Sequence, residues 1–206
     1  MFSYIDAMHK IADGAKHKVV VFELNANNHS QRRALANALA ISAAERDGRL
    51  PIVTSANCLQ PDGQNNNGWD QGLLFLSPSQ VWLQPPGYVT QMISHNFETL
   101  YIESRIKASG GCLNVSAKRS EDGKTLVLDV VNLGPGATPA TIIIRGYSPT
   151  KPAAVEELAG SLDLMNSAKA PDRIRPIEKQ WQTNFENGKA EYGFPPCSFT
   201  VIKFTK

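Results

Sequence analysis

The sequence lacks clustered charge and long apolar runs, and each absence excludes a class of protein. Its 21 Lys and Arg residues and 19 Asp and Glu residues are scattered and give a formal net charge of +2. Because nucleic acids and anionic membranes attract clustered Lys and Arg, the sequence predicts neither partner. No apolar stretch approaches the roughly 20 residues needed to span a bilayer. Residues 1–18 lack the apolar region of a signal peptide and predict a short amphipathic helix.

Cysteine and histidine are also scarce. Cys58, Cys112 and Cys197 lie far apart, so they give neither a zinc-binding spacing nor a disulfide framework, and we expect buried thiols. The 4 histidines have no metal-ligand spacing and are expected at the surface. The sequence also has no Gly-rich phosphate loop, no Gly-x-Ser-x-Gly and no His-Glu-x-x-His. It therefore predicts neither a metal nor a cofactor.

The first 96 residues alternate between helical and strand patterns. We expect helices near 3–13, from Ser30 to Asp47 and near 87–96, and strands at 18–23 and 51–56. Gly48 is expected to end the second helix. This alternation is typical of parallel βα units. The continuous run VVVF at 19–22 is typical of a parallel strand that is covered on both faces.

From about residue 97 the pattern changes to short alternating segments separated by Gly and Pro turns. It predicts an antiparallel, jelly-roll-like β-sandwich, with a hairpin turn at the Asp-Gly pair of SEDGKT. In TLVLDVVN, alternate residues face opposite sides, and we expect Asp129 to face solvent. Residues 165–181 are expected to form a long irregular connection. The sequence therefore predicts an α+β chain in two parts, an α/β part followed by a sandwich.

Polar side chains follow both predicted parallel strands of the first part. Glu23 ends the first strand, at the position where βα proteins gather functional side chains, although a solvated glutamate would give the same pattern. Asn57 and Gln60 follow the second strand, and Trp69 lies in the loop beyond them. Amides and an indole suit a polyhydroxylated ligand, but such a loop is equally typical of turn conformations, with Trp69 filling a core edge.

Several segments resemble, in order, the C-terminal part of family 51 glycoside hydrolases, the α-L-arabinofuranosidases. The resemblance rests on VVVFELNAN, SANCLQPDGQNNNGWDQGLLFLSPSQVWLQPPGYVTQM, LNVSAKRSEDGKTLVLDVVNLG, LDLMNSAKAPDRIRPIE and PPCSFTVIKF. It covers about residues 17–205, and its strength lies in the order of the segments. Family members are (β/α)₈ barrels joined to a β-sandwich, and they hydrolyse terminal α-L-arabinofuranosyl groups of arabinan and related saccharides with retention.

The resemblance implies a role for each candidate residue. Strand 18–23 would be the seventh barrel strand, with Glu23 as the catalytic nucleophile and Asn25 as a flanking polar residue. Strand 51–56 would be the eighth, Asn57 or Gln60 would contact the sugar, and Trp69 would lie in the following loop. Residues 78–96 would form the last barrel helix. Residues 1–96 would then be a partial TIM barrel, with its last two strands and helices, and 97–206 the sandwich domain.

The sequence departs from the family pattern in one respect. A retaining glycosidase needs a second carboxyl group about 5–5.5 Å from the first. In this family it belongs to an Asn-Glu pair, which this sequence lacks. We therefore expect a C-terminal portion that is inactive alone. Its exposed strand edges would be stabilised by homo-oligomerisation, by docking to the missing barrel portion, or by the sandwich itself.

Another class of function is also compatible with the sequence. The sandwich could be a noncatalytic carbohydrate-binding or structural module, with residues 1–95 as a cap. Sugar binding would then depend on sandwich aromatics such as Trp181 and be insensitive to a change at Glu23.

Overall fold

The computed structural model describes residues 2–15, 17–24, 26, 28–64, 70–107, 111–183 and 185–206. The helices are α1 (Phe2–Ala12), α2 (Gln31–Asp47) and α3 (Pro85–His95). The strands of the first half are β1 (Val21–Leu24), β2 (Val53–Ser55), β3 (Leu59–Pro61), β4 (Leu74–Ser77) and β5 (Gln80–Leu83). Those of the second half are β6 (Leu100–Ile102), β7 (Leu113–Arg119), β8 (Thr125–Asn132), β9 (Thr138–Ile143), β10 (Ala153–Ala159), β11 (Ile177–Trp181), β12 (Lys189–Phe194) and β13 (Ser198–Thr205).

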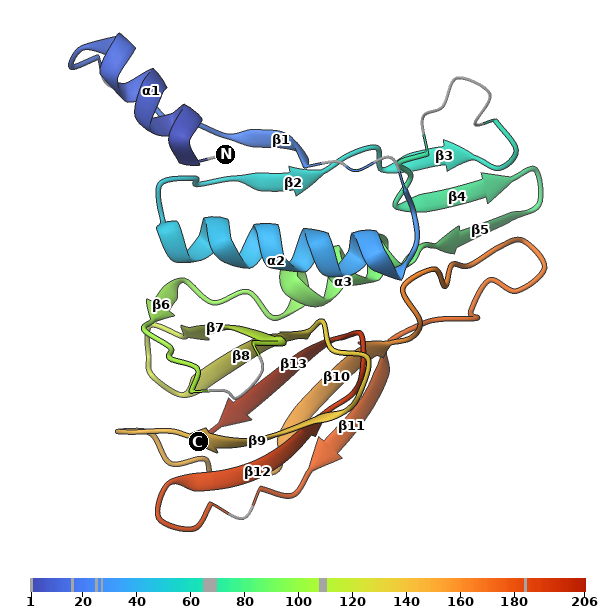
Figure 1. The fold of residues 1–206 in the computed structure, drawn as a ribbon. Coiled ribbons are helices and arrows are strands. Elements are labelled where there is room, and N and C mark those ends of the chain that lie inside the picture. Colours follow the sequence, from blue (N-terminus) through green and yellow to red (C-terminus); the bar gives the residue numbers. More distant parts are fainter. Residues whose placement is uncertain are drawn as a thin grey trace.

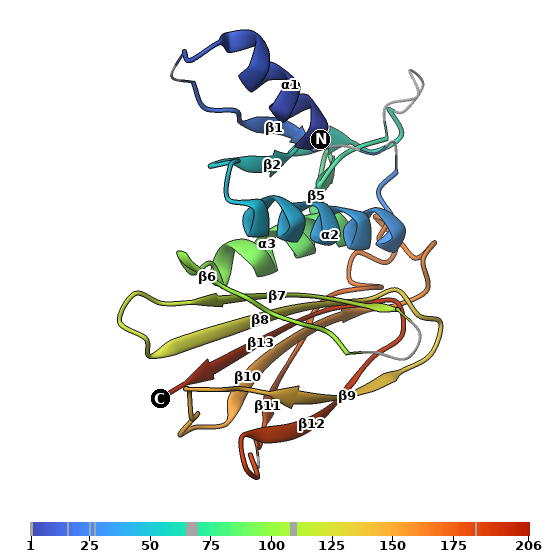
Figure 2. The same ribbon diagram turned by 60° about the vertical axis from the view of Figure 1, so that its left-hand side comes forward.

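The elements are stacked in layers (Figures 1 and 2). Strands β1 and β2 pair in parallel and lie on one side of helices α2 and α3. On the other side of these helices lies an antiparallel sheet in the order β11-β10-β13-β8-β7-β6, and β9 pairs with β12 across from it. Strands β3, β4 and β5 form a small sheet beside the first layer. The structure is thus rich in strands, with helices between two β layers.

Helix α2 lies at the centre of the stack and is held at both ends. Gly48 ends the helix in the left-handed conformation, with φ 73° and its N–H bonded to Ala44 O, as predicted. At the other end, the backbone N–H groups of Gln31 and Arg32 donate to the carbonyls of Leu164 and Leu162 at 2.9 and 2.8 Å. First-turn N–H groups have no partner within a helix, so a distant segment supplies their acceptors.

Two apolar cores cover the faces of the six-stranded sheet. One core lies between the sheet and the helices and contains Val127, Val131 and Phe199. The other lies between the sheet and β9–β12 and contains Leu126, Val130 and Phe204. The predicted alternation of TLVLDVVN is therefore confirmed, and both of its faces are buried. The hairpin predicted at Asp-Gly is also confirmed, because Gly123 turns at φ 70° between β7 and β8.

The prediction that Asp129 faces solvent is wrong. Asp129 points toward the helices with Val127 and Val131, and it is 1% exposed. Its carboxylate lies 2.7 Å from Lys118 Nζ, and Glu45 of α2 lies 3.5 Å from the same ammonium group. Burial raises the pKa of Asp129 to about 6, and the charge and hydrogen bond of Lys118 oppose that rise. Because the helices cover this face of the sheet, a carboxylate there is buried, and a buried carboxylate needs a paired opposite charge. Lys118 supplies that charge for Asp129.

Two predicted segments are also corrected. Residues 177–181 are not irregular, because they form β11 along β10. The predicted helix at 78–96 begins only at Pro85, since residues 80–83 pair with β4 as strand β5. Prolines in the first turn suit a helix start, where their missing N–H groups are not needed.

The first layer and the cysteines differ from expectation as well. Strand β1 is covered on one face only, and Phe22 on the other face is 64% exposed. Cys58 is exposed, and Cys112 and Cys197 are partly buried, so the predicted burial is wrong for Cys58. None of the helices in the described part of the chain combines the length and the hydrophobicity of a membrane span. The division at residue 96 stays a prediction.

Candidate functional site

The parallel pairing of β1 and β2 brings the carboxyl ends of both strands to one edge. Leu24 lies opposite Ser55 in the register, and Thr54 Oγ1 donates to Phe22 O at 3.0 Å. Glu23 is exposed on β1, one residue before the strand ends. Its carboxylate is therefore accessible at the edge where βα proteins place reactive groups.

A buried arginine holds the loops that follow these strands. Arg33 of α2 is 1% exposed, and its guanidinium donates to the carbonyls of Asn28 at 3.1 Å, Ala56 at 2.9 Å and Gln71. Burial lowers its pKa to about 10, which the charge of Asp70 partly offsets, so Arg33 remains a cation at neutral pH. Several planar N–H donors on one rigid group fix three loop segments together.

Hydrogen bonds of two asparagines, Asn37 and Asn28, fix the same edge. Asn37, one helical turn after Arg33, donates from Nδ2 to Ser55 Oγ at 2.8 Å. Asn28 Oδ1 accepts from the backbone N–H and the hydroxyl of Ser30 at 2.7 and 2.6 Å. These bonds connect the start of α2 to the end of each strand and make the edge rigid.

The two predicted amides beyond β2 lie in different settings. Gln60 is 5% exposed, and its Oε1 accepts from the backbone N–H groups of Gln71 and Gly72 at 3.0 and 2.7 Å. Asn57 is partly buried, and its backbone carbonyl accepts from Leu73 N at 3.0 Å. Both residues accept hydrogen bonds from the backbone of residues 71–73, at the end of the loop. Their predicted contact with a sugar stays a prediction.

The remaining predicted residues lie elsewhere. Asn25 and Trp69 are outside the described residues. Trp181 lies in the sandwich core, with its ring centroid 4.7 Å from that of Tyr192 and 6.2 Å from that of Phe204. It contributes to packing there, so the structure gives no support to a sugar-stacking role for this aromatic residue.

The sequence did not predict the role of Arg33 or the pairing of His29 with Asp70. His29 was expected at the surface, but its side chain is 13% exposed, its Nδ1 is hydrogen-bonded to Asp70 Oδ1, and its ring lies 4.7 Å from that of Phe75. A signal for Arg33 was present, because it falls with Asn37 and other buried residues on one helical stripe. The 41-residue separation of His29 and Asp70 left no local signal for their pairing.

Clusters of three or more His, Cys, Asp or Glu side chains that could hold a metal ion are absent from the described part of the chain. Among the described residues, this edge carries the exposed carboxylate of Glu23, and the loops that follow the two strands are fixed by the buried cation of Arg33. Such a site can use a carboxylate as a nucleophile or a base and can hydrogen-bond a polar ligand.

Comparison with known proteins identifies the class of this architecture. Residues 23–198 match the model of the α-L-arabinofuranosidase C-terminal domain. No curated protein matches the chain significantly. The match covers most of the chain and includes Glu23. The chain therefore belongs to the family of α-L-arabinofuranosidase C-terminal domains.

Solved structures with the same fold come from larger enzymes. The arabinose-bound MgGH51 α-L-arabinofuranosidase superposes with a TM-score of 0.77 at 20% identity, over 87% of this chain and 28% of its own. The Thermotoga maritima α-L-arabinofuranosidase, an arabinose complex, gives 0.74 at 16%, over 87% and 39%. The xylanase C catalytic domain of family GH30 from Talaromyces cellulolyticus gives 0.66 at 15%, over 94% and 42%. The chain thus spans less than half the length of each.

Proposed function

We propose that this chain supplies the catalytic nucleophile of a retaining α-L-arabinofuranosidase. Glu23 would attack the anomeric carbon of a terminal arabinofuranosyl group and expel the leaving alcohol. Water would then hydrolyse the arabinosyl-enzyme ester, releasing arabinose with retained configuration. The observation that carries the proposal is the exposed carboxylate of Glu23 at the end of a parallel strand. The family match, which begins at this residue, supports it.

We also propose that residues 1–96 are the last two βα units of a barrel, followed by the sandwich at 97–206. The uncovered face of the β1–β2 sheet supports this proposal, because Phe22 is 64% and Ile52 is 44% exposed there. Apolar side chains at this level of exposure are expected where a strand layer continues into further structure. The parallel pairing agrees with barrel geometry.

In this proposal the general acid comes from outside these 206 residues. Retaining glycosidases protonate the leaving oxygen with a second carboxyl group, and general acid catalysis typically contributes about 10²–10⁴-fold. We therefore expect negligible hydrolysis by the chain alone. The polar groups fixed by Arg33 would orient the sugar, with Asn25, Asn57, Gln60 and Trp69 as the predicted contacts.

Hydrolysis of 4-nitrophenyl α-L-arabinofuranoside tests the proposal in two arms. The chain alone should give no turnover above background. A fusion that places the preceding barrel portion of the Thermotoga maritima enzyme before this chain should hydrolyse the substrate, and Glu23→Gln should abolish that activity. Glu103→Gln is the matched control, because Glu103 is an exposed glutamate paired with Arg105 on the sandwich side. A folded, active fusion that retains its rate with Glu23→Gln would refute the assignment of the nucleophile.

A further inference from the structure

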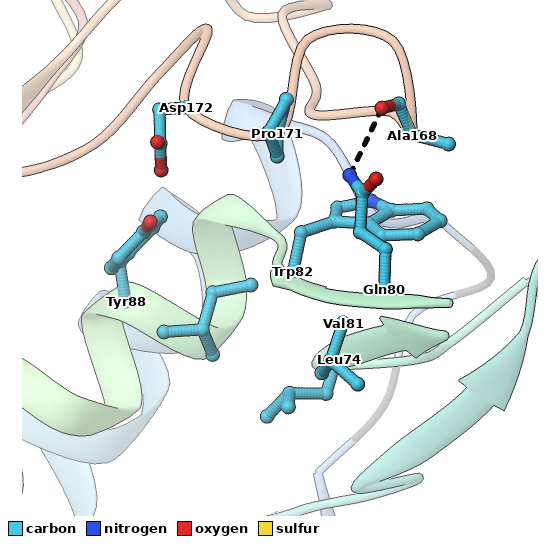
Figure 3. A pocket seen from close by; sticks show the side chains of 9 residues that line it. Leu74, Gln80, Val81, Trp82, Tyr88, Ala168, Pro171 and Asp172 are labelled. Carbon is cyan, nitrogen blue, oxygen red and sulfur yellow. Dashed lines mark hydrogen bonds between the residues drawn. The ribbon is translucent and has the colours of Figure 1, made fainter. Parts of the chain in front are cut away.

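An open pocket lies away from the edge that holds Glu23. Strands β4 and β5, the start of α3 and the loop between β10 and β11 line an open volume of about 600 Å³ (Figure 3). This volume lies in the range of small-molecule sites. None of the lining residues belongs to β1, β2 or the loops at their carboxyl ends. The pocket therefore has a lining of its own, and the ring of Phe75 lies between Trp82 and His29 of the candidate site.

The wall on the loop side is built on a buried asparagine. Asn166 is 2% exposed, and its Nδ2 donates to the carbonyls of Leu83 and Ile174 at 2.8 and 2.9 Å. Its Oδ1 accepts from Ile174 N at 2.9 Å, and Gln84 exchanges two further hydrogen bonds with its backbone, both 2.9 Å. The loop is therefore fixed to the junction of β5 and α3, so the pocket is preformed.

One buried donor in the pocket wall has no partner. Trp82 is 4% exposed, and its Nε1 has no hydrogen-bond acceptor among the described residues. An unpaired buried N–H group is unfavourable, and Trp82 lines the pocket, so a ligand acceptor at this wall would stabilise it. Beside it, Gln80 Nε2 donates to Ala168 O at 2.9 Å, so its amide has Oε1 left to accept from a ligand.

The mouth of the pocket carries a second polar pair. Figure 3 shows the hydroxyl of Tyr88 and the carboxylate of Asp172 pointing toward one another across it. Burial and the nearby charge of Asp172 raise the pKa of Tyr88, which keeps the phenol protonated as a donor. Leu74, Leu83 and Pro171 contribute apolar surface between the polar groups.

The combination of groups selects one class of ligand. An anion would be repelled by Asp172, and a cation would leave the indole N–H of Trp82 unpaired. An apolar ligand would satisfy neither group. A sugar unit has hydroxyls that both donate and accept and C–H faces that pack on apolar side chains. We propose that this pocket is a binding site for a neutral sugar unit of a saccharide chain, separate from the site of hydrolysis.

This inference rests on the proposed function only for the choice of sugars, which are pentose-containing saccharides. The site itself is tested by binding alone, without turnover. The experiment is a ¹H–¹⁵N NMR titration of the full chain with α-1,5-L-arabinotriose and, separately, with xylotriose. Trp82→Phe identifies the Trp82 indole resonance among those of the 3 tryptophans. We expect at least one trisaccharide to shift that resonance with saturation, because its N–H gains an acceptor. The two sugars distinguish an arabinan from a xylan source.

Variants at the mouth test the assignment of the pocket. Asp172→Asn should weaken binding about tenfold and Tyr88→Phe about threefold, as expected for a charged and a neutral hydrogen bond. Asp163→Asn is the matched control, since its side chain is 85% exposed and pairs with Arg32 outside the pocket. Glu23→Gln should also leave binding unchanged, which separates this site from the proposed catalytic role. The proposal is overturned if neither sugar shifts the Trp82 resonance, or if the shift titrates identically in both mouth variants.

Discussion

The two β layers on either side of the helices are stabilised in different ways. In the six-stranded sheet both faces are covered, and Phe199 and Phe204, on opposite faces, are each 0% exposed. In the β1–β2 layer Phe22 lies open, and the buried guanidinium of Arg33 holds the strand ends. The six-stranded sheet derives its stability from apolar burial, and the β1–β2 layer derives its stability from directed hydrogen bonds. The sheet thus supports the fold, while the pair of strands positions the candidate site.

The largest expected difference is between two phenylalanines. Phe204→Ala should lower the free energy of unfolding by about 3–5 kcal/mol, because it leaves a cavity in a closed core. Phe22→Ala should change it by less than about 0.5 kcal/mol, because that ring is mostly in water. Urea denaturation followed by circular dichroism measures both values. Similar losses for the two variants would contradict the comparison of the layers.

A buried ion pair should be nearly as sensitive. Lys118→Met leaves Asp129 without its counter-charge beneath α2, and we expect a loss of about 3 kcal/mol. The double variant Lys118→Met with Asp129→Leu removes both charges and should recover most of that loss. Thermal and urea unfolding of the single and double variants measure the difference. Equal stability of single and double variants would mean that charge burial is not the cause.

A smaller effect is expected in the hydrogen-bonded layer. Arg33→Lys replaces a planar group that reaches three carbonyls with a single ammonium, and it should cost about 2 kcal/mol. Hydrogen exchange should then accelerate at amides near Ser55 and Gln60. The neighbouring Arg32→Lys is the control, because Arg32 is 57% exposed in a surface pair with Asp163 and should cost less than about 0.5 kcal/mol. Equal costs would remove the special role of the buried arginine.

The smallest effect concerns pH. The pKa of Asp129 in the folded state is about 6, above its ordinary value, so the folded state binds more protons than the unfolded state between about pH 4 and pH 6. The contribution of this group to stability therefore rises as pH falls through 6 and becomes constant below about pH 4. Between pH 7 and pH 5 the gain should be about 1 kcal/mol.

Asp129→Asn is the control for this titration. The difference in unfolding free energy between the original chain and the variant, measured by urea denaturation at pH 5, 6 and 7, isolates the contribution of Asp129. A difference that does not change with pH would show that this carboxyl does not titrate in that window.

Much of the fold could be predicted from local pattern. The helix from Ser30, its end at Gly48 and the Asp-Gly hairpin follow from rules that depend on a few neighbouring residues. The predictions of which residues are buried were the ones that failed. VVVF was expected to be covered on both faces, and Asp129 was expected in solvent, because a strand pattern does not reveal how many layers pack on a sheet. Strand β11 was missed since its residues IEKQW are mostly exposed and lack alternation.

For the candidate site, sequence supplied the position of Glu23 but little of its support. A carboxylate at the end of an apolar run is a local feature. The network of Arg33 is not, because its acceptors are backbone carbonyls, which any residue can provide. Likewise, nothing local in the sequence shows that the oxygen of Gln60 accepts from loop N–H groups, and its predicted contact with a sugar stays a prediction. Amide side chains bind backbone and ligand with the same atoms, so composition alone does not separate the two uses.

The way in which α2 begins has a consequence for biosynthesis. Its first N–H groups donate to the carbonyls of Leu162 and Leu164. The side-chain amide of Gln31 donates a hydrogen bond to Cys197 O, 166 residues away. A ribosome releases the chain from its N-terminus at about 5–20 residues per second. The start of α2 therefore stays open for several seconds at least, until the last strands emerge. Because contacts over such separations form slowly, the first turn of α2 should stay accessible to solvent during that interval.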